Sequence, residues 1–186
     1  MRYEKRPKNQ ARSYTQTAIG LHWLIALALA ANFALGVGMH ELPLSPQKLQ
    51  LYAWHKWAGV TLFGLVTLRL IWRKVVPPPE LLPAPAWQQF AARLLHNVLY
   101  ILMFAIPLSG WLMSSAAGFP VVYLGVLPLP DLVPKNKELY DAFKKAHEAL
   151  IFSLLLLVIV HTAAALKHHF IDHDATLTRI LPWQKK

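Results

Sequence analysis

The feature that most constrains this chain is a set of long stretches that carry no charged side chain. No Asp, Glu, Lys or Arg occurs at residues 13–40, 94–130 or 149–166. A further stretch, residues 54–75, is apolar from 58 to 68 and has its charged residues near its ends. A charge at the centre of a lipid bilayer costs about 2.5–3.5 kcal/mol, and a helix needs about 20 apolar residues to cross one. The sequence therefore predicts helices that cross a membrane.

We expect four spans, at approximately residues 18–39, 54–75, 94–115 and 147–167. Four such spans predict an all-α fold, a transmembrane four-helix bundle with up-down-up-down connections. The segments between them, including the proline-rich 77–85, have the composition of connectors, so we expect a single membrane domain over residues 1–186. The chain is 55% hydrophobic and only 15% charged, so its net charge of +10 does not indicate a nucleic-acid partner.

The distribution of basic residues predicts the orientation of the spans. With four spans, thirteen of the 19 Lys and Arg residues fall on the side that holds both termini, and six fall on the other. The thirteen are Arg2, Lys5, Arg6, Lys8, Arg12, Arg69, Arg73, Lys74, Arg93, Lys167, Arg179, Lys185 and Lys186. Basic residues are enriched in cytoplasmic loops, so we expect both termini in the cytoplasm.

Histidines are the main candidates for a functional site. The chain has nine of them and no cysteine, which excludes thiolate metal sites and the covalent attachment of c-type haem. His147 and His161 are fourteen residues apart, which separates them by about 21 Å along a helix while leaving them on nearly the same face. One helix can therefore present a ligand to each of two stacked cofactors. At matching depths on other spans, His22 is the expected partner at the cytoplasmic side and His55 at the outer side.

Imidazole ligands from two helices suit the iron of b-type haem. Arg69, fourteen residues after His55, is expected at the inner depth, where haem propionates would supply the anion that a buried arginine needs. Three alternatives stay open: a carrier of divalent metals or protons that uses the His clusters, a haem-bearing anchor subunit of a larger dehydrogenase or hydrogenase, and histidines that merely lie at the membrane interface. The roles of His40 and His96 also stay open.

Several motifs resemble the bacterial cytochrome b561 family, specifically its short four-span, inner-membrane type. The matching segments are Gly-Leu-His-Trp at 20–23, Trp-His-Lys at 54–56, Ala-His-Glu at 146–148 and Ala-Leu-Lys-His-His-Phe-Ile-Asp at 165–172. The resemblance extends over almost the whole chain. It implies a multi-pass protein of the bacterial inner membrane.

The resemblance also implies two bis-histidine haems b, with His22 and His161 on the cytoplasmic haem and His55 and His147 on the periplasmic one. Electrons would pass between a small periplasmic donor, with superoxide as a candidate, and membrane ubiquinone. His168, just beyond the fourth span, is a candidate contact for the quinone head group. Whether the protein is an enzyme acting on superoxide or quinol, and in which direction electrons flow, stay open.

Overall fold

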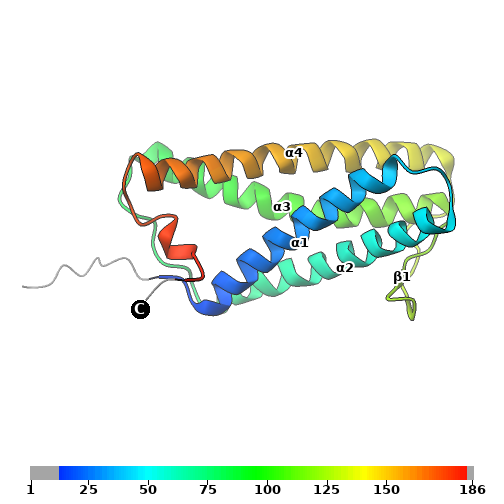
Figure 1. Cartoon of the computed structure of the whole chain (residues 1–186), viewed down its shortest axis with the longest axis horizontal. Helices are drawn as coiled ribbons and strands as arrows, with labels where there is room; N and C mark the ends of the chain where they lie inside the picture. Colours follow the sequence, from blue (N-terminus) through cyan, green and yellow to red (C-terminus); the bar gives the residue numbers. More distant parts are fainter. Residues whose placement is uncertain (1–12, 184–186) are drawn as a thin grey trace, which may run out of the picture.

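The computed structural model describes residues 13–183 and is dominated by four long helices (Figure 1). These are Gln16–His40 (α1), Pro46–Val75 (α2), Ala86–Ala117 (α3) and Lys137–Phe170 (α4). Between α3 and α4 lies a small antiparallel hairpin of Val122–Tyr123 (β1) and Leu127–Pro128 (β2), in which Val122 is opposite Pro128. A short 3-10 helix, Thr178–Ile180 (η1), follows α4. The prediction of a mostly helical protein is confirmed.

Each long helix begins or ends at a residue that satisfies free backbone groups. The side chains of Thr15, Ser45 and Asn136 accept hydrogen bonds from backbone N–H groups in the first turns of α1, α2 and α4. Pro46 is the first residue of α2, where the missing N–H costs nothing. At the end of α3, Gly118 has a φ of 78°, a left-handed conformation that favours glycine. Local sequence thus sets the helix limits.

Each helix runs opposite to the one before it along the long axis of the molecule (Figure 1). One end of the bundle therefore gathers the first turns of α1 and α3 and the last turns of α2 and α4. We call it the basic end, because it carries Arg69, Arg73, Lys74, Arg93 and Lys167. Seven more of the thirteen basic residues lie outside the described residues: Arg2, Lys5, Arg6, Lys8, Arg12, Lys185 and Lys186.

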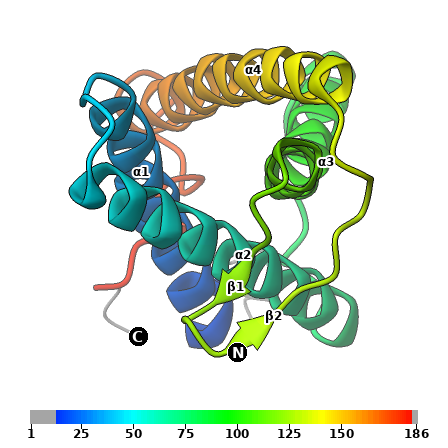
Figure 2. The ribbon, with the colours of Figure 1, turned by 90° about the vertical axis from the view of Figure 1, so that its right-hand side faces the viewer.

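Helix packing follows the order of the chain. α1 packs against α2, α2 against α3, and α3 against α4, whereas α1 and α4 have no extensive backbone contact in the described part of the chain. Seen end-on, the four helices surround a common centre (Figure 2). Ile25, Leu62 and Val66 form a small buried cluster between α1 and α2, and α4 has no fully buried residue. Many large apolar side chains are exposed, as expected where lipid covers them.

Three of the four helices, α1, α3 and α4, are long and apolar enough to cross a membrane by length and composition. α2 is not among them, and it carries Lys48, Lys56, Arg69, Arg73 and Lys74. The protein is therefore a helical membrane protein with three candidate spans among residues 13–183. A crossing by α2, and the limits of all four spans, stay predictions.

Candidate functional site

A cavity of about 2140 Å³ lies between the four helices. Its wall includes His55 and His147 toward one end and His22 and His161 toward the basic end. These are the four histidines that the sequence singled out, and they come from α1, α2 and α4. The structure thus brings the predicted residues to one cavity.

The pair farther from the basic end consists of His55 on α2 and His147 on α4. Their ring centres are 6.5 Å apart. Nδ1 of His147 lies 3.1 Å from the carbonyl oxygen of Ile106 and 2.9 Å from Ser109 Oγ. Because a carbonyl only accepts, Nδ1 carries the ring proton, and Nε2 keeps the lone pair that a metal requires. His147 is therefore held in the tautomer of a metal ligand.

Two glycines make room for these rings. A Cβ added at Gly36 or at Gly110 would lie 3.1 Å from Cε1 of His55 or His147, respectively, which is closer than ordinary van der Waals contact. Sequence reasoning did not assign a role to either glycine. The available signal was the presence of glycine inside an apolar span, which is typical of close approach between helices.

The pair at the basic end is His22 on α1 and His161 on α4, with ring centres 6.3 Å apart. Two imidazoles that bind one metal ion from opposite sides, at a metal–nitrogen distance of about 2.0–2.1 Å, have ring centres roughly 6 to 6.5 Å apart. Both pairs match this spacing. The residues present therefore fit a metal held between two imidazoles at each end of the cavity.

His96 on α3 joins the histidines at the basic end. Its ring centre is 5.3 Å from that of His161. This separation is shorter than expected for two opposite ligands of one ion, so the geometry favours His22 over His96 as the partner of His161. His96 is instead a wall residue of the same site.

Arg69 lies against His22, as its spacing predicted, but with contacts that the sequence did not indicate. It donates hydrogen bonds to the carbonyl of Ala18 (2.6 Å) and the hydroxyl of Tyr100 (3.1 Å), and its Nη2 is 3.4 Å from His22 Nδ1. Arginine only donates, so Nδ1 must accept in that contact. Metal binding through Nε2 of His22 would put a proton on Nδ1, and Nη2 would then be free for another acceptor.

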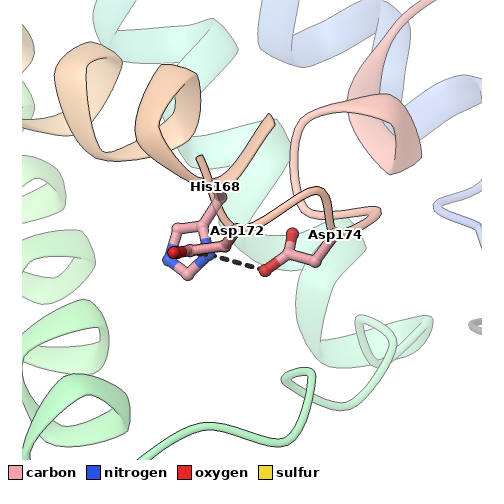
Figure 3. A group of neighbouring side chains, drawn as sticks. All are labelled: His168, Asp172 and Asp174. Carbon is pink, nitrogen blue, oxygen red and sulfur yellow. Dashed lines mark hydrogen bonds and ion pairs between the residues drawn. The ribbon is translucent and has the colours of Figure 1, made fainter. Parts of the chain in front are cut away.

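His168, near the end of α4, is held by two carboxylates (Figure 3). Its Nδ1 is 2.6 Å from Asp174 and 3.2 Å from Asp172, and Lys167 also pairs with Asp172 at 2.6 Å. His168 and Asp174 line the large cavity. This side chain thus has a fixed orientation at the basic end, where the sequence predicted a ligand contact.

The segment that follows α4 folds back over the basic end. The indole N–H of Trp23 donates to the carbonyl of Ile180 at 2.8 Å, and buried Arg179 donates to the carbonyl of Glu80 at 3.0 Å. The segment therefore joins α1 to the proline-rich connector and forms part of the cavity wall. His40, at the end of α1, also borders the cavity but is exposed and pairs with Glu41, so its role stays open.

Comparison with known proteins agrees with this architecture. Residues 13–183 match the family model described as prokaryotic cytochrome b561. The chain is 35% identical over 181 residues to cytochrome b561 homolog 2 of Escherichia coli (strain K12), covering 93% of each chain. It is 34% identical over 174 residues to cytochrome b561 homolog 1 of the same organism, covering 92% of this chain and 98% of the relative. It is also 26% identical over 176 residues to a Yersinia pestis protein named "Probable superoxide oxidase CybB", covering 92% of this chain and 97% of that protein. The chain therefore belongs to the prokaryotic cytochrome b561 family, whose members are b-haem proteins of membrane electron transfer.

Proposed function

We propose that this protein is a four-span, di-haem cytochrome of the bacterial inner membrane that moves electrons between a periplasmic donor and the ubiquinone pool. The observation that carries the proposal is the presence of two histidine pairs, with ring centres 6.3 and 6.5 Å apart, in one cavity. Each pair has the spacing of two ligands on opposite sides of one metal ion. Both termini would lie in the cytoplasm, so the basic end would face inward.

His22 and His161 would hold the inner haem, and His55 and His147 the outer one. Haem b supplies the capacity to accept and release a single electron. The chain supplies the ligands and their separation, since His147 and His161 lie about 21 Å apart along α4. Ser109 and Ile106 keep the proton of His147 on Nδ1, and Gly36 and Gly110 let both outer rings approach the helices beside them.

Arg69 would balance negative charge at the inner site. It is half-buried among α1, α2 and α3 and has one N–H group in only a loose contact with His22. A propionate is the acceptor that a haem would bring there. Because Arg69 also donates to Ala18 and Tyr100, it would keep its position whether or not the propionate is bound.

Ubiquinone would bind at the basic end near His168. The contact with Asp174 occupies Nδ1 of His168 and leaves Nε2 to meet a quinone oxygen. α1 and α4 lack extensive backbone contact in the described part of the chain, and a lipid-soluble molecule would approach between them. One ubiquinone would take up two electrons and two protons to become ubiquinol.

Superoxide is the donor that the opposite end favours. Lys56, Lys135 and Lys144 line the cavity there, and such cations attract a small anion. The name of the Yersinia pestis relative points to the same donor. Two superoxide anions would give up one electron each and leave as two molecules of O2, which balances the reduction of one quinone.

The proposal is tested first by haem content and then by reduction. Purified protein should contain two haems per chain, and anaerobic addition of superoxide or ubiquinol should reduce them. His147→Ala should retain one haem, whereas His40→Ala, which changes an exposed histidine of α1, should retain two. A protein without a Soret band would refute the proposal and leave the metal carrier as the better hypothesis. A tightly bound soluble dehydrogenase, with no reduction by either donor, would instead support the anchor subunit.

A further inference from the structure

The two outer histidines rest on their neighbouring helices in the same way. The ring of His147 lies over Gly110 of α3, and its Nδ1 meets the carbonyl of Ile106, four residues before that glycine. The ring of His55 lies over Gly36 of α1, and it interacts with the backbone of Asn32, again four residues before the glycine. A Cβ added at either glycine would lie 3.1 Å from Cε1 and 3.5 Å from Nδ1 of the histidine ring above it. The outer site is thus built from two copies of one arrangement.

The two copies differ in the polar side chain that lies beside the histidine ring. At His147, the residue just before the glycine is Ser109, whose hydroxyl lies 2.9 Å from Nδ1. At His55 the corresponding residue is Leu35, which has no polar group. The side chain of Asn32 is therefore the polar group of α1 that can take the place of the serine.

Two buried side-chain atoms in the described part of the chain lack a hydrogen bond of normal geometry, and they are Nδ1 of His55 and Oδ1 of Asn32. Nδ1 can carry a proton and donate, whereas an amide oxygen can only accept. Buried polar groups without partners are rare, because each loses its bonds to water. Nδ1 of His55 and Oδ1 of Asn32 are therefore a donor and an acceptor that can pair in the working protein, beside the contact of the ring with the Asn32 backbone.

We propose that Asn32 is a positioning residue for His55, and that its amide oxygen accepts the Nδ1 proton of that ring. This contact fixes the tautomer in which Nε2 carries the lone pair and faces the cavity. The inference rests on the proposed function, because it takes His55 as a ligand of the outer haem. Hydrogen-bond partners of this kind orient a metal-binding histidine and tune how strongly it donates to the metal.

The direction in which Asn32 substitutions move the midpoint potential of the outer haem distinguishes a hydrogen-bonding role from simple packing. Asn32→Asp would place an anion at the same hydrogen bond, make His55 a stronger donor, and favour oxidised iron. Asn32→Leu would remove the acceptor and have the opposite effect. A residue that only fills space would not move the potential in opposite directions with these two changes. Asn97, an exposed asparagine of α3 toward the basic end, is the matched control.

The experiment is a spectroelectrochemical titration of the purified holoprotein, with low-temperature electron paramagnetic resonance of both haems. We expect the midpoint potential of the outer haem to fall in Asn32→Asp and to rise in Asn32→Leu, with a change in its g-values. The inner haem should keep its signals, and Asn97→Asp and Asn97→Leu should match the wild type. If Asn32→Leu does not bind haem, Asn32→Asp alone tests the inference, because the midpoint potential of its outer haem must fall.

His55→Ala separates failure of this inference from failure of the proposed function. Loss of the outer haem in His55→Ala, together with unchanged potential and g-values in the Asn32 variants, would overturn the role of Asn32 alone. Retention of both haems in His55→Ala would overturn the ligand assignment, and the inference with it. Equal shifts of the same sign in both Asn32 variants would indicate packing and would also overturn the inference.

Discussion

Gly110→Ala is the sharpest test of how the outer site is built. The new Cβ would lie 3.1 Å from Cε1, 3.5 Å from Nδ1 and 3.8 Å from Nε2 of His147, so the ring must shift by a few tenths of an ångström. Metal–ligand distances tolerate changes of only about 0.2 Å. The ring is also held by Ile106 and Ser109, so a shift weakens that hydrogen bonding. A net hydrogen bond contributes about 1 kcal/mol, which corresponds to roughly fivefold weaker binding of the outer haem.

The assay is a titration of haem-depleted protein with haem, followed in the Soret band, with His147→Ala to identify the outer site. Gly38→Ala is the matched control, because a Cβ there meets nothing within 4 Å. Both changes replace a helical glycine by alanine and gain about 1 kcal/mol of helix propensity. If Gly110→Ala binds the outer haem as tightly as Gly38→Ala does, the close approach of His147 to α3 has no functional role.

Three further predictions concern the basic end. His22→Ala should lose the inner haem, whereas His96→Ala should keep it; the reverse result in pyridine haemochrome assays would exchange their roles. Arg69→Leu should lower the potential of the inner haem and leave the outer one unchanged, because a buried cation favours the reduced state. Partial burial raises the pKa of Asp174, but hydrogen bonds from Thr176 and the contact with His168 outweigh it, so the pKa lies below its usual value. Ionised Asp174 therefore stabilises the folded state at pH values above its unfolded pKa of about 3.9. This stabilisation is lost as the pH falls through the lower pKa that Asp174 has in the folded protein. Hydrogen exchange in residues 171–183 should speed up in acid in the wild type, and Asp174→Asn should abolish that dependence.

The sequence predicted the parts of the site that depend on a single helix. The fourteen-residue spacing of His147 and His161 requires only that both lie on one helix, and α4 spans Lys137–Phe170 without a break. The depth of His22 and of His55 in the membrane was predicted from the hydropathy of the single span that holds each of them. Their approach to His161 and His147 agrees with the pairing, and the identity of the ligands stays a prediction.

The parts that depend on how helices cross could not be read from the sequence. The contacts of Gly36 and Gly110 with histidine rings require the relative rotation of two helices, which no spacing within one helix defines. Gly59 illustrates the difference, since it lies four residues after His55 and therefore on the same side of α2. In the structure it borders the cavity, and a Cβ there would meet nothing within 4 Å. The place of His96 beside His161 likewise depends on α3 packing against α4.

The sparse contact between α1 and α4 has a consequence for how the protein matures. In the described part of the chain, the helices are joined mainly to their neighbours in sequence, and backbone contact between α1 and α4 is sparse. Each proposed haem would tie α4 to α1 or to α2, and so would close the bundle from within. A ligand that binds only the folded state at a hundred times its Kd adds about 2.7 kcal/mol of stability. Haem supply should therefore control the abundance of the protein through proteolysis, and haem-starved cells should lose the polypeptide itself.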